Sequence, residues 1–314
     1  MAAKNKDGAF DITTVAPEHR EQVEAMIPNP VAFEAYTQRE LPGGFMDFDY
    51  FEAARQLRHN VLLVGPTGAG KTTAGRAYAA WLQRPFASVE FNGAMDPAAT
   101  IGAMQVSPET GLPEWRWGEL SLATMYGGVV FLDEVNFAPP RFTAAFHGVL
   151  DARQTLYVAD LGTRVRKHPE TLIIGAYNPR YVGTNLLNEA FTNRWALTID
   201  PWGYDAQVEA ERIGTYSPTL LRRVREMRQD PAIQGDIGTN AMEEFIHISL
   251  NLNIDAAISL FLAKLAPEDR GIADRVFEAE KVVIADELGA DLADNYDEEA
   301  EEAEDPVIAG ADPA

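Results

Sequence analysis

The sequence predicts an α/β fold in which a parallel sheet is sandwiched by helices and followed by a small all-helical domain. Short apolar runs alternate with helical patterns through most of the chain, an order typical of parallel strands joined by helices. The first run, 61–64, passes through a glycine-rich turn straight into a helix of small residues. From about Asp205 onward only helical patterns are found. The sheet is therefore expected first and the helical domain after it.

Composition limits the classes of protein that this chain can be. Its 314 residues suffice for one large or two ordinary domains. The absence of cysteine excludes a disulfide framework, a thiolate zinc site and a cysteine nucleophile. No apolar run approaches the length of a membrane-spanning helix, and the N-terminus lacks the apolar core of a signal peptide. We therefore expect a cytoplasmic protein without a membrane partner.

The net charge of −22 is distributed unevenly. Residues 286–314 carry twelve acidic residues and no basic one, which leaves about −10 on the rest of the chain. Such a tail is expected to be disordered. An acidic body argues against tight binding to nucleic acid, because that binding depends on Lys and Arg that neutralise phosphates.

Four segments are expected along the chain: an N-terminal arm at 1–40, of which residues 1 to about 30 are interpreted as loosely held, an α/β core at 41–204, a helical lid domain at 205–285 and the acidic tail at 286–314. Strands are expected at 61–64, 86–92, 129–132, 154–160, 163–166, 171–177 and 197–200. One helix is expected at 48–57 and another directly after the glycine-rich turn. Further helices are expected at 118–126, 141–150, 186–195, 205–213, 218–229, 240–250, 255–267 and 273–288. An insert rich in turn residues occupies 93–118.

The glycine-rich turn fits the phosphate-loop pattern of two glycines followed by Lys and Thr. Glycines let successive backbone N–H groups point inward at an anion, and the following helix presents its positive end to the same anion. Lys71 would reach the β- and γ-phosphates of ATP, and the Thr72 hydroxyl would complete the shell of a Mg²⁺ ion. The nucleotide-binding residues are predicted to be Gly65, Pro66, Thr67, Gly68, Ala69, Gly70, Lys71, Thr72 and Thr73.

Two carboxylates follow the apolar run 129–132. Ligands of open α/β sheets bind at the carboxyl ends of the strands, beside the phosphate loop. Asp133 is predicted to hold the Mg²⁺ through water, and Glu134 to polarise the water that attacks the γ-phosphate. The alternative is an ordinary solvated turn.

Two further polar residues are candidates, each with a structural alternative. Asn178 ends the apolar run 171–177 and could orient the attacking water, or could simply begin an Asn-Pro turn. Arg194 could reach the γ-phosphate of a neighbouring subunit, since a guanidinium is always charged and matches phosphate geometry. A surface salt bridge is the other reading. The aromatic residues Phe45, Phe48 and Tyr50 are either core or the wall of an adenine pocket.

Taken together, GPTGAGKTT, VVFLDEVNFAPPR, RKHPETLIIGAYNP and LNEAFTNRW resemble the AAA+ ATPases over about residues 41–265. Within them the chain is similar to the MoxR-like and dynein-related branch, which includes CbbQ, NorQ, GvpN and CobS, and most of all to CobS-like and bacteriophage members. The resemblance implies a P-loop NTPase core and a helical lid. It makes 65–73 the Walker A motif, Asp133 and Glu134 the Walker B motif, Asn178 sensor 1 and Arg194 the arginine finger.

The resemblance also implies roles for less conspicuous positions. Asn92 stands where such proteins often carry a polar switch that restrains the catalytic Glu. The insert at 93–118 corresponds to one that lines the pore or contacts partners. A sensor-2 Arg is expected near the start of a lid helix, but Asn240 stands there and its sequence context predicts a helix N-cap. Arg222 or Arg223 could replace it.

The leading hypothesis is an ATP-hydrolysing homo-oligomer, expected to be a hexameric ring, that remodels or activates a partner protein. In the resembled branch this partner is commonly a von Willebrand factor A (VWA) domain protein. The alternatives are an ATP-gated oligomeric scaffold with little turnover, which the Asn240 departure favours, and a nucleic-acid motor, which the acidic charge disfavours. A GTPase is a minor variant, because no guanine-specific motif is visible although the dynein-related branch does include GTP users.

Overall fold

The computed structural model describes residues 10–92, 100–108, 110–138, 146–179, 189–233 and 235–292. They form two compact units, the first ending at Val208 and the second beginning at Glu209. Parts of four expected segments lie outside the described residues: the insert at 93–99, two helices at 141–145 and 186–188, and the acidic tail at 293–314.

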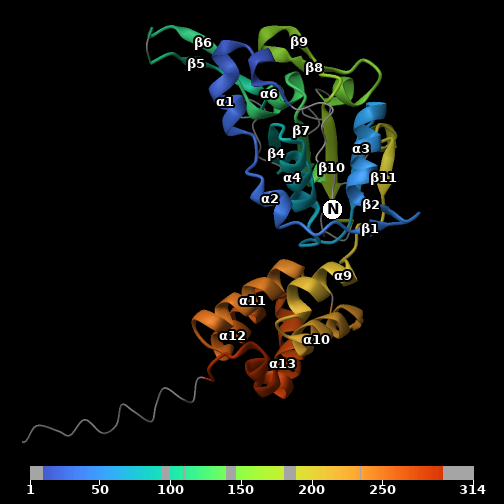
Figure 1. Ribbon diagram of the computed structural model, residues 1–314, viewed down its shortest axis with the longest axis vertical. Helices are drawn as coiled ribbons and strands as arrows, with labels where there is room; N and C mark the ends of the chain where they lie inside the picture. The colour runs from blue at the N-terminus through green and yellow to red at the C-terminus, as the bar shows by residue number, and fades with distance from the viewer. Residues whose placement is uncertain are drawn as a thin grey trace, which may run out of the picture. The chain divides into compact units, whose positions relative to one another are not determined.

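The first unit is built on a parallel sheet, as predicted. Among the described residues this sheet has five strands in the order β11-β3-β10-β7-β4 (Figure 1). Parallel registers join all four neighbouring pairs. The strands are β3 (Val61–Val64), β4 (Phe86–Glu90), β7 (Val129–Asp133), β10 (Leu172–Tyr177) and β11 (Leu197–Ile199). The α/β fold class is confirmed.

Alternation along the strands gives the sheet two apolar faces. Val61 and Leu63 face one core, together with α3 (Asp47–Leu57) and α4 (Lys71–Leu82). Leu62 and Val64 face the other core. That second core also contains residues of α6 (Glu119–Met125), of the helical segment 146–150, and of the antiparallel hairpin β8 (Thr155–Val158) and β9 (Thr163–Arg166). Both faces of the sheet are thus covered, which explains why its strands read as continuous apolar runs.

The expectation of a loosely held arm is wrong for its described part. Val15, Val23 and Met26 are buried in the core, and the Met26 carbonyl accepts a hydrogen bond from the Phe86 N–H at 2.9 Å. The arm is therefore part of the folded unit. Its elements are η1 (Ile12–Thr14), η2 (Pro17–His19), α1 (Arg20–Ala25) and α2 (Val31–Glu34), followed by the short pair β1 (Glu40–Leu41) and β2 (Phe45–Met46).

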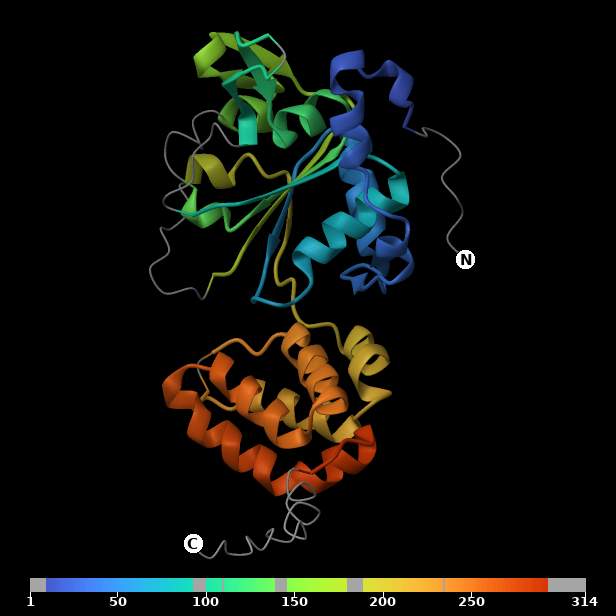
Figure 2. The same cartoon turned by 90° about the vertical axis from the view of Figure 1, so that its left-hand side faces the viewer.

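The described part of the insert contains an antiparallel hairpin that the sequence did not predict, made of β5 (Gly102–Val106) and β6 (Pro113–Trp117). Its strand residues are mostly exposed, so the usual alternation of apolar and polar residues is missing. The hairpin lies at the same end of the first unit as α1 and the β8–β9 hairpin (Figures 1 and 2).

The second unit is helical, as expected, around a core in which the rings of Phe245, Phe261 and Phe277 pack together. Its helices are the end of α9 (Ala206–Glu209), the π-helix η5 (Ala210–Gly214), α10 (Pro218–Gln229), α11 (Thr239–Asn251), α12 (Ile254–Lys264) and α13 (Pro267–Leu288). Among the described residues, no helix is long and apolar enough to cross a membrane.

Three helix starts differ from those predicted. Asn240 is not an N-cap, because α11 begins one residue earlier and Gly238 occupies the cap position. Asn253 caps α12 with its side chain, so that helix does not start at Asp255. Finally, α13 begins at Pro267 instead of 273, since proline is tolerated in the first turn of a helix. It ends at Leu288, so the first residues of the expected tail are helical.

Candidate active site at the carboxyl edge of the sheet

The predicted phosphate loop connects the carboxyl end of β3 to the start of α4. Gly68 and Gly70 have φ angles of +72° and +79°, in the left-handed region that glycine enters without strain. Helix α4 begins at Lys71, directly after Gly70. The backbone is therefore folded as an anion cradle at a helix N-terminus, the arrangement that binds phosphate groups.

The Lys71 side chain lies along this loop. Its Nζ donates hydrogen bonds to the carbonyl oxygens of Gly65 and Pro66, both at 2.8 Å. The residue is only 7% exposed. A buried ammonium held by backbone carbonyls is positioned beside the cradle, where it can compensate the charge of a phosphate.

Thr72 and Asp133 come from different elements and meet at this edge. The Thr72 hydroxyl donates to Asp133 Oδ2 at 2.8 Å. A hydroxyl and a carboxylate next to a phosphate cradle are the hard oxygen ligands that Mg²⁺ prefers. These two side chains therefore fit the predicted Mg²⁺ and would hold it at this edge of the sheet.

Glu134 has an unusual backbone conformation. Its φ of 51° and ψ of 46° place a non-glycine residue in the left-handed region, an uncommon conformation for a residue with a side chain. Burial raises the pKa of its carboxyl above the usual range, and nearby Asp133 raises it further, whereas Lys71 lowers it. The raised pKa makes this carboxylate a better proton acceptor than a solvated one.

Two asparagine residues surround that carboxyl. Asn178 is 3% exposed; its Nδ2 donates to the Thr67 hydroxyl at 3.2 Å, and its backbone N–H is hydrogen-bonded to Glu134. Asn136, which sequence reasoning missed, is also buried, and its amide nitrogen donates to Glu134 Oε2 at 3.3 Å in the orientation that satisfies both groups. Asn178 thus joins the phosphate loop to the carboxylate. Asn92 is exposed just beyond β4, and its role as a switch stays a prediction.

Arg194 lies away from these groups, at the amino edge of the sheet. Its carbonyl accepts from Asn60 Nδ2 at 3.4 Å, and Asn60 directly precedes β3, whereas the phosphate loop follows β3. The Arg194 Nε is 4.0 Å from Asp151 Oδ2. Within one subunit the structure brings Lys71, Thr72, Asp133, Glu134 and Asn178 together and leaves Arg194 at the opposite edge.

Comparison with known proteins identifies the family. A model described as AAA domain (dynein-related subfamily) matches residues 60–195. The uncharacterized protein YojN of Bacillus subtilis (strain 168) is 33% identical over 223 residues, which cover 69% of this chain and 72% of YojN. The chain belongs to the dynein-related AAA family. An uncharacterized protein of Staphylococcus epidermidis (strain ATCC 12228) is 32% identical over 191 residues, covering 60% of this chain and 69% of that protein. A crystal structure from Cytophaga hutchinsonii is similar over 86% of this chain and 92% of its own, with 16% identity and a TM-score of 0.41.

Membership of this AAA family supports nucleotide binding and ATPase activity for the α/β unit. The matched segment begins just before β3 and ends at Trp195, so it includes every side chain of the predicted site.

The aromatic residues considered for an adenine wall divide into two groups. Phe48 is 4% exposed and packs on Tyr36, Phe51 and Tyr78, so it is core. Phe45 and Tyr50 line a cavity of about 660 Å³ that is separate from the phosphate loop.

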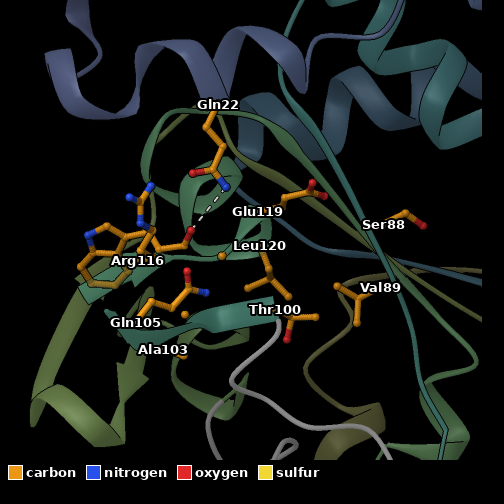
Figure 3. Close-up of a pocket in the computed structure, with 12 residues that line it drawn as sticks. Gln22, Ser88, Val89, Thr100, Ala103, Gln105, Arg116, Glu119 and Leu120 are labelled. Carbon is orange, nitrogen blue, oxygen red and sulfur yellow. Dashed lines mark hydrogen bonds between the residues drawn. The ribbon is translucent and has the colours of Figure 1, made fainter. Parts of the chain in front are cut away.

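The AAA unit has another cavity, of about 430 Å³, beside the β5–β6 hairpin (Figure 3). Gln22 of α1 reaches over it and donates to the Trp117 carbonyl at 3.4 Å, while Arg116 and Glu119 supply opposite charges. None of the predicted site residues lines it. The cavity is therefore separate from the nucleotide chemistry.

Proposed function

We propose that this protein is an ATP-hydrolysing subunit of a homo-oligomeric ring, predicted to be a hexamer. Its nucleotide site is formed by 65–73 together with Asp133, Glu134 and Asn178, and is completed by Arg194 of a neighbouring subunit. The observation that carries this proposal is the division of these groups between the two edges of the sheet. The site has its cradle, its metal-ligand oxygens and its base in one subunit, but its candidate arginine lies at the far edge.

The residues of the chain divide the work of hydrolysis. Loop N–H groups and Lys71 hold the phosphates, and Thr72 with Asp133 would hold Mg²⁺, which when bound neutralises phosphate charge. Glu134 accepts the proton of the attacking water, and Asn178 orients that water. The neighbour's Arg194 stabilises the charge that develops on the γ-phosphoryl group.

We further propose that the ring acts on a partner protein in the manner of MoxR-like ATPases, with a VWA-domain protein as the first candidate. The resemblance of the four motifs to that branch supports this. The acidic net charge of −22 supports a protein partner over nucleic acid.

The first experiment is subunit mixing. Glu134→Gln and Arg194→Ala should each abolish most ATP turnover. A mixture of the two variants should regain activity, because some sites combine the intact Glu134 of one subunit with the intact Arg194 of the other. Arg153→Ala is the matched control: Arg153 also binds Asp151 but is exposed, and its loss should leave turnover unchanged. If the mixture stays inactive while both variants assemble, Arg194 does not act between subunits.

One observation favours the scaffold alternative. The arginines considered as substitutes for a sensor-2 residue are engaged within the second unit: Arg223 Nε donates to Glu280 at 2.8 Å, and Arg222 lies 3.5 Å from the same carboxylate. An ATP-gated scaffold would bind ATP and assemble, yet show little turnover. Phosphate release by the purified protein, alone and with its partner, separates this scaffold from the ATPase.

A further inference from the structure

Two carbonyl groups of the phosphate loop point away from the cradle and are held there by side chains from distant parts of the chain. The Tyr204 hydroxyl donates to the Thr67 carbonyl at 2.8 Å. The Ala69 carbonyl accepts two hydrogen bonds, from Trp202 Nε1 at 3.0 Å and from Arg39 Nη2 at 2.8 Å. Neither donor segment belongs to the loop or to its flanking strand and helix.

Two of these donors, Trp202 and Arg39, are themselves fixed by packing. Trp202 is fully buried and stacks on Phe51, with ring centroids 6.2 Å apart and planes 10° apart. Arg39 is 7% exposed, its guanidinium lies 4.2 Å from the Trp202 ring centroid, and its Nη1 donates to the Gly203 carbonyl at 2.8 Å. The buried guanidinium is thus held by stacking on one side and by two carbonyls on the other.

The backbone around Trp202 is attached to the same region. Its N–H donates to the Val64 carbonyl at 2.6 Å, at the end of β3. A Cβ on Gly65 would lie 2.0 Å from the Trp202 carbonyl oxygen, so the first residue of the loop must be glycine for this approach. The loop and the segment 202–204 therefore pack as one body.

Peptide geometry connects these contacts with phosphate binding. In a trans peptide the C=O of one residue and the N–H of the next point in opposite directions. Holding the Thr67 and Ala69 carbonyls outward therefore directs the N–H groups of Gly68 and Gly70 toward the opposite side, where an anion would be bound. Donation to a carbonyl also polarises its amide, which strengthens the N–H as a donor.

We propose that Arg39, Trp202 and Tyr204 are positioning residues that bind the outward carbonyls of the phosphate loop and so hold its N–H groups ready for phosphate. The inference rests on the proposed function, since it assumes that the loop binds a nucleoside polyphosphate. These three side chains act through the backbone and need no contact with the nucleotide.

The test is the affinity for mant-ADP, measured by fluorescence titration of the full chain. Tyr204→Phe and Trp202→Phe each remove one neutral donor and should weaken binding about fivefold. Arg39→Met removes a charge-assisted bond and should weaken it about 30-fold, with partial recovery in Arg39→Lys. The effect should fall on KM for ATP, with kcat nearly unchanged, because ground-state phosphate binding is what is lost.

Matched controls remove similar groups elsewhere. Tyr157→Phe removes an exposed phenol, and Arg84→Met removes a buried arginine that donates to the Gly127 carbonyl. Neither should change mant-ADP affinity, even if Arg84→Met lowers the melting temperature. The double variant Arg39→Met/Trp202→Phe should weaken mant-ADP binding by a larger factor than the product of the factors for the two single variants. Only in the double variant does the Ala69 carbonyl lose both donors.

The outcomes separate the two proposals. If the wild-type protein does not bind mant-ADP, the proposed function fails. If it binds and the Phe variants at 202 and 204 bind within twofold of it, the positioning role is overturned. Should Arg39→Met fail to fold, those two conservative variants still decide the question.

Discussion

The close approach of Gly65 to Trp202 makes a prediction at the scale of a single residue. Gly65→Ala places a methyl group against the Trp202 carbonyl, so the loop and the segment 202–204 must separate. Overpacking of this kind costs about 2 kcal/mol. Chemical denaturation should show that loss, with weaker mant-ADP binding. Gly203→Ala, where the added Cβ meets open space, is the control and should stay within about 0.5 kcal/mol of wild type.

Asp47 gives a pH prediction at the same scale. It is fully buried; the Tyr36 hydroxyl and the Phe48 N–H donate to it, and burial raises its pKa from 3.8 to about 6. The folded state holds this proton more tightly than the unfolded chain. The contribution of protonated Asp47 to the free energy of unfolding is therefore complete below pH 3.8. It is lost as pH rises through 6, a change of about 3 kcal/mol.

Asp47→Asn keeps the shape of the side chain and cannot ionise. The free energy of unfolding of this variant, relative to wild type, should therefore rise between pH 4 and pH 7. Urea denaturation at several pH values measures this difference. A difference that is flat with pH would show that Asp47 does not titrate in this range.

The raised pKa of Glu134 predicts the acid limb of the turnover profile. A general base must be ionised, so kcat/KM for ATP, which reports the free enzyme, should fall on acidification at a pH above the usual range of a glutamate. Asn136→Ala removes a donor that stabilises the charged form, so it should move this limb to still higher pH. Steady-state turnover between pH 5 and 8 measures the profiles of wild type and Asn136→Ala. If their acid limbs coincide, the hydrogen bond from Asn136 to Glu134 is contradicted.

At the scale of elements, Lys167 connects the end of the β8–β9 hairpin to the start of β3. It is 3% exposed, and its Nζ donates to Asn60 Oδ1 at 2.9 Å. Burial lowers its pKa from 10.5 to about 8. The folded state therefore releases this proton more easily than the unfolded chain, so stability rises as pH increases from 8 to 10.5 and is lost as pH falls through 8.

Lys167→Met removes this dependence. Wild type should gain about 3 kcal/mol over the variant as pH rises through that window. Thermal unfolding at pH 7.5 and pH 10 gives the comparison, with exposed Lys264→Met as the control. If stability changes equally with pH in Lys167→Met and in wild type, this prediction is wrong.

The elements also show what the sequence could predict. The run 129–132 is apolar throughout because β7 is covered on both faces, and Asp133 follows from the rule that ligands gather at carboxyl edges. The β5–β6 hairpin was missed because its exposed strands carry no alternation. No local pattern could reveal the contact of Arg39 with Ala69, since it joins residues far apart in sequence. The left-handed conformation of Glu134 is likewise set by its surroundings.

At the scale of the whole molecule, charge makes a prediction about binding partners. With a net charge of −22, the protein should show no salt-sensitive affinity for single- or double-stranded DNA. Fluorescence anisotropy at 50 and 200 mM salt, with and without ATP, measures this. Binding that weakens steeply with salt would favour the nucleic-acid motor.

The position of Arg194 at the amino edge has a geometric consequence for assembly. If each subunit offers its arginine from one face and receives another at a different face, the contact is heterologous, and repeated contacts either close or grow as a filament. In an open chain of subunits, the phosphate loop of the subunit at one end receives no Arg194 from a neighbour, so that site is inactive. Closure removes that inactive end, so activity per subunit should rise with protein concentration and then level off once the chain of contacts has closed on itself.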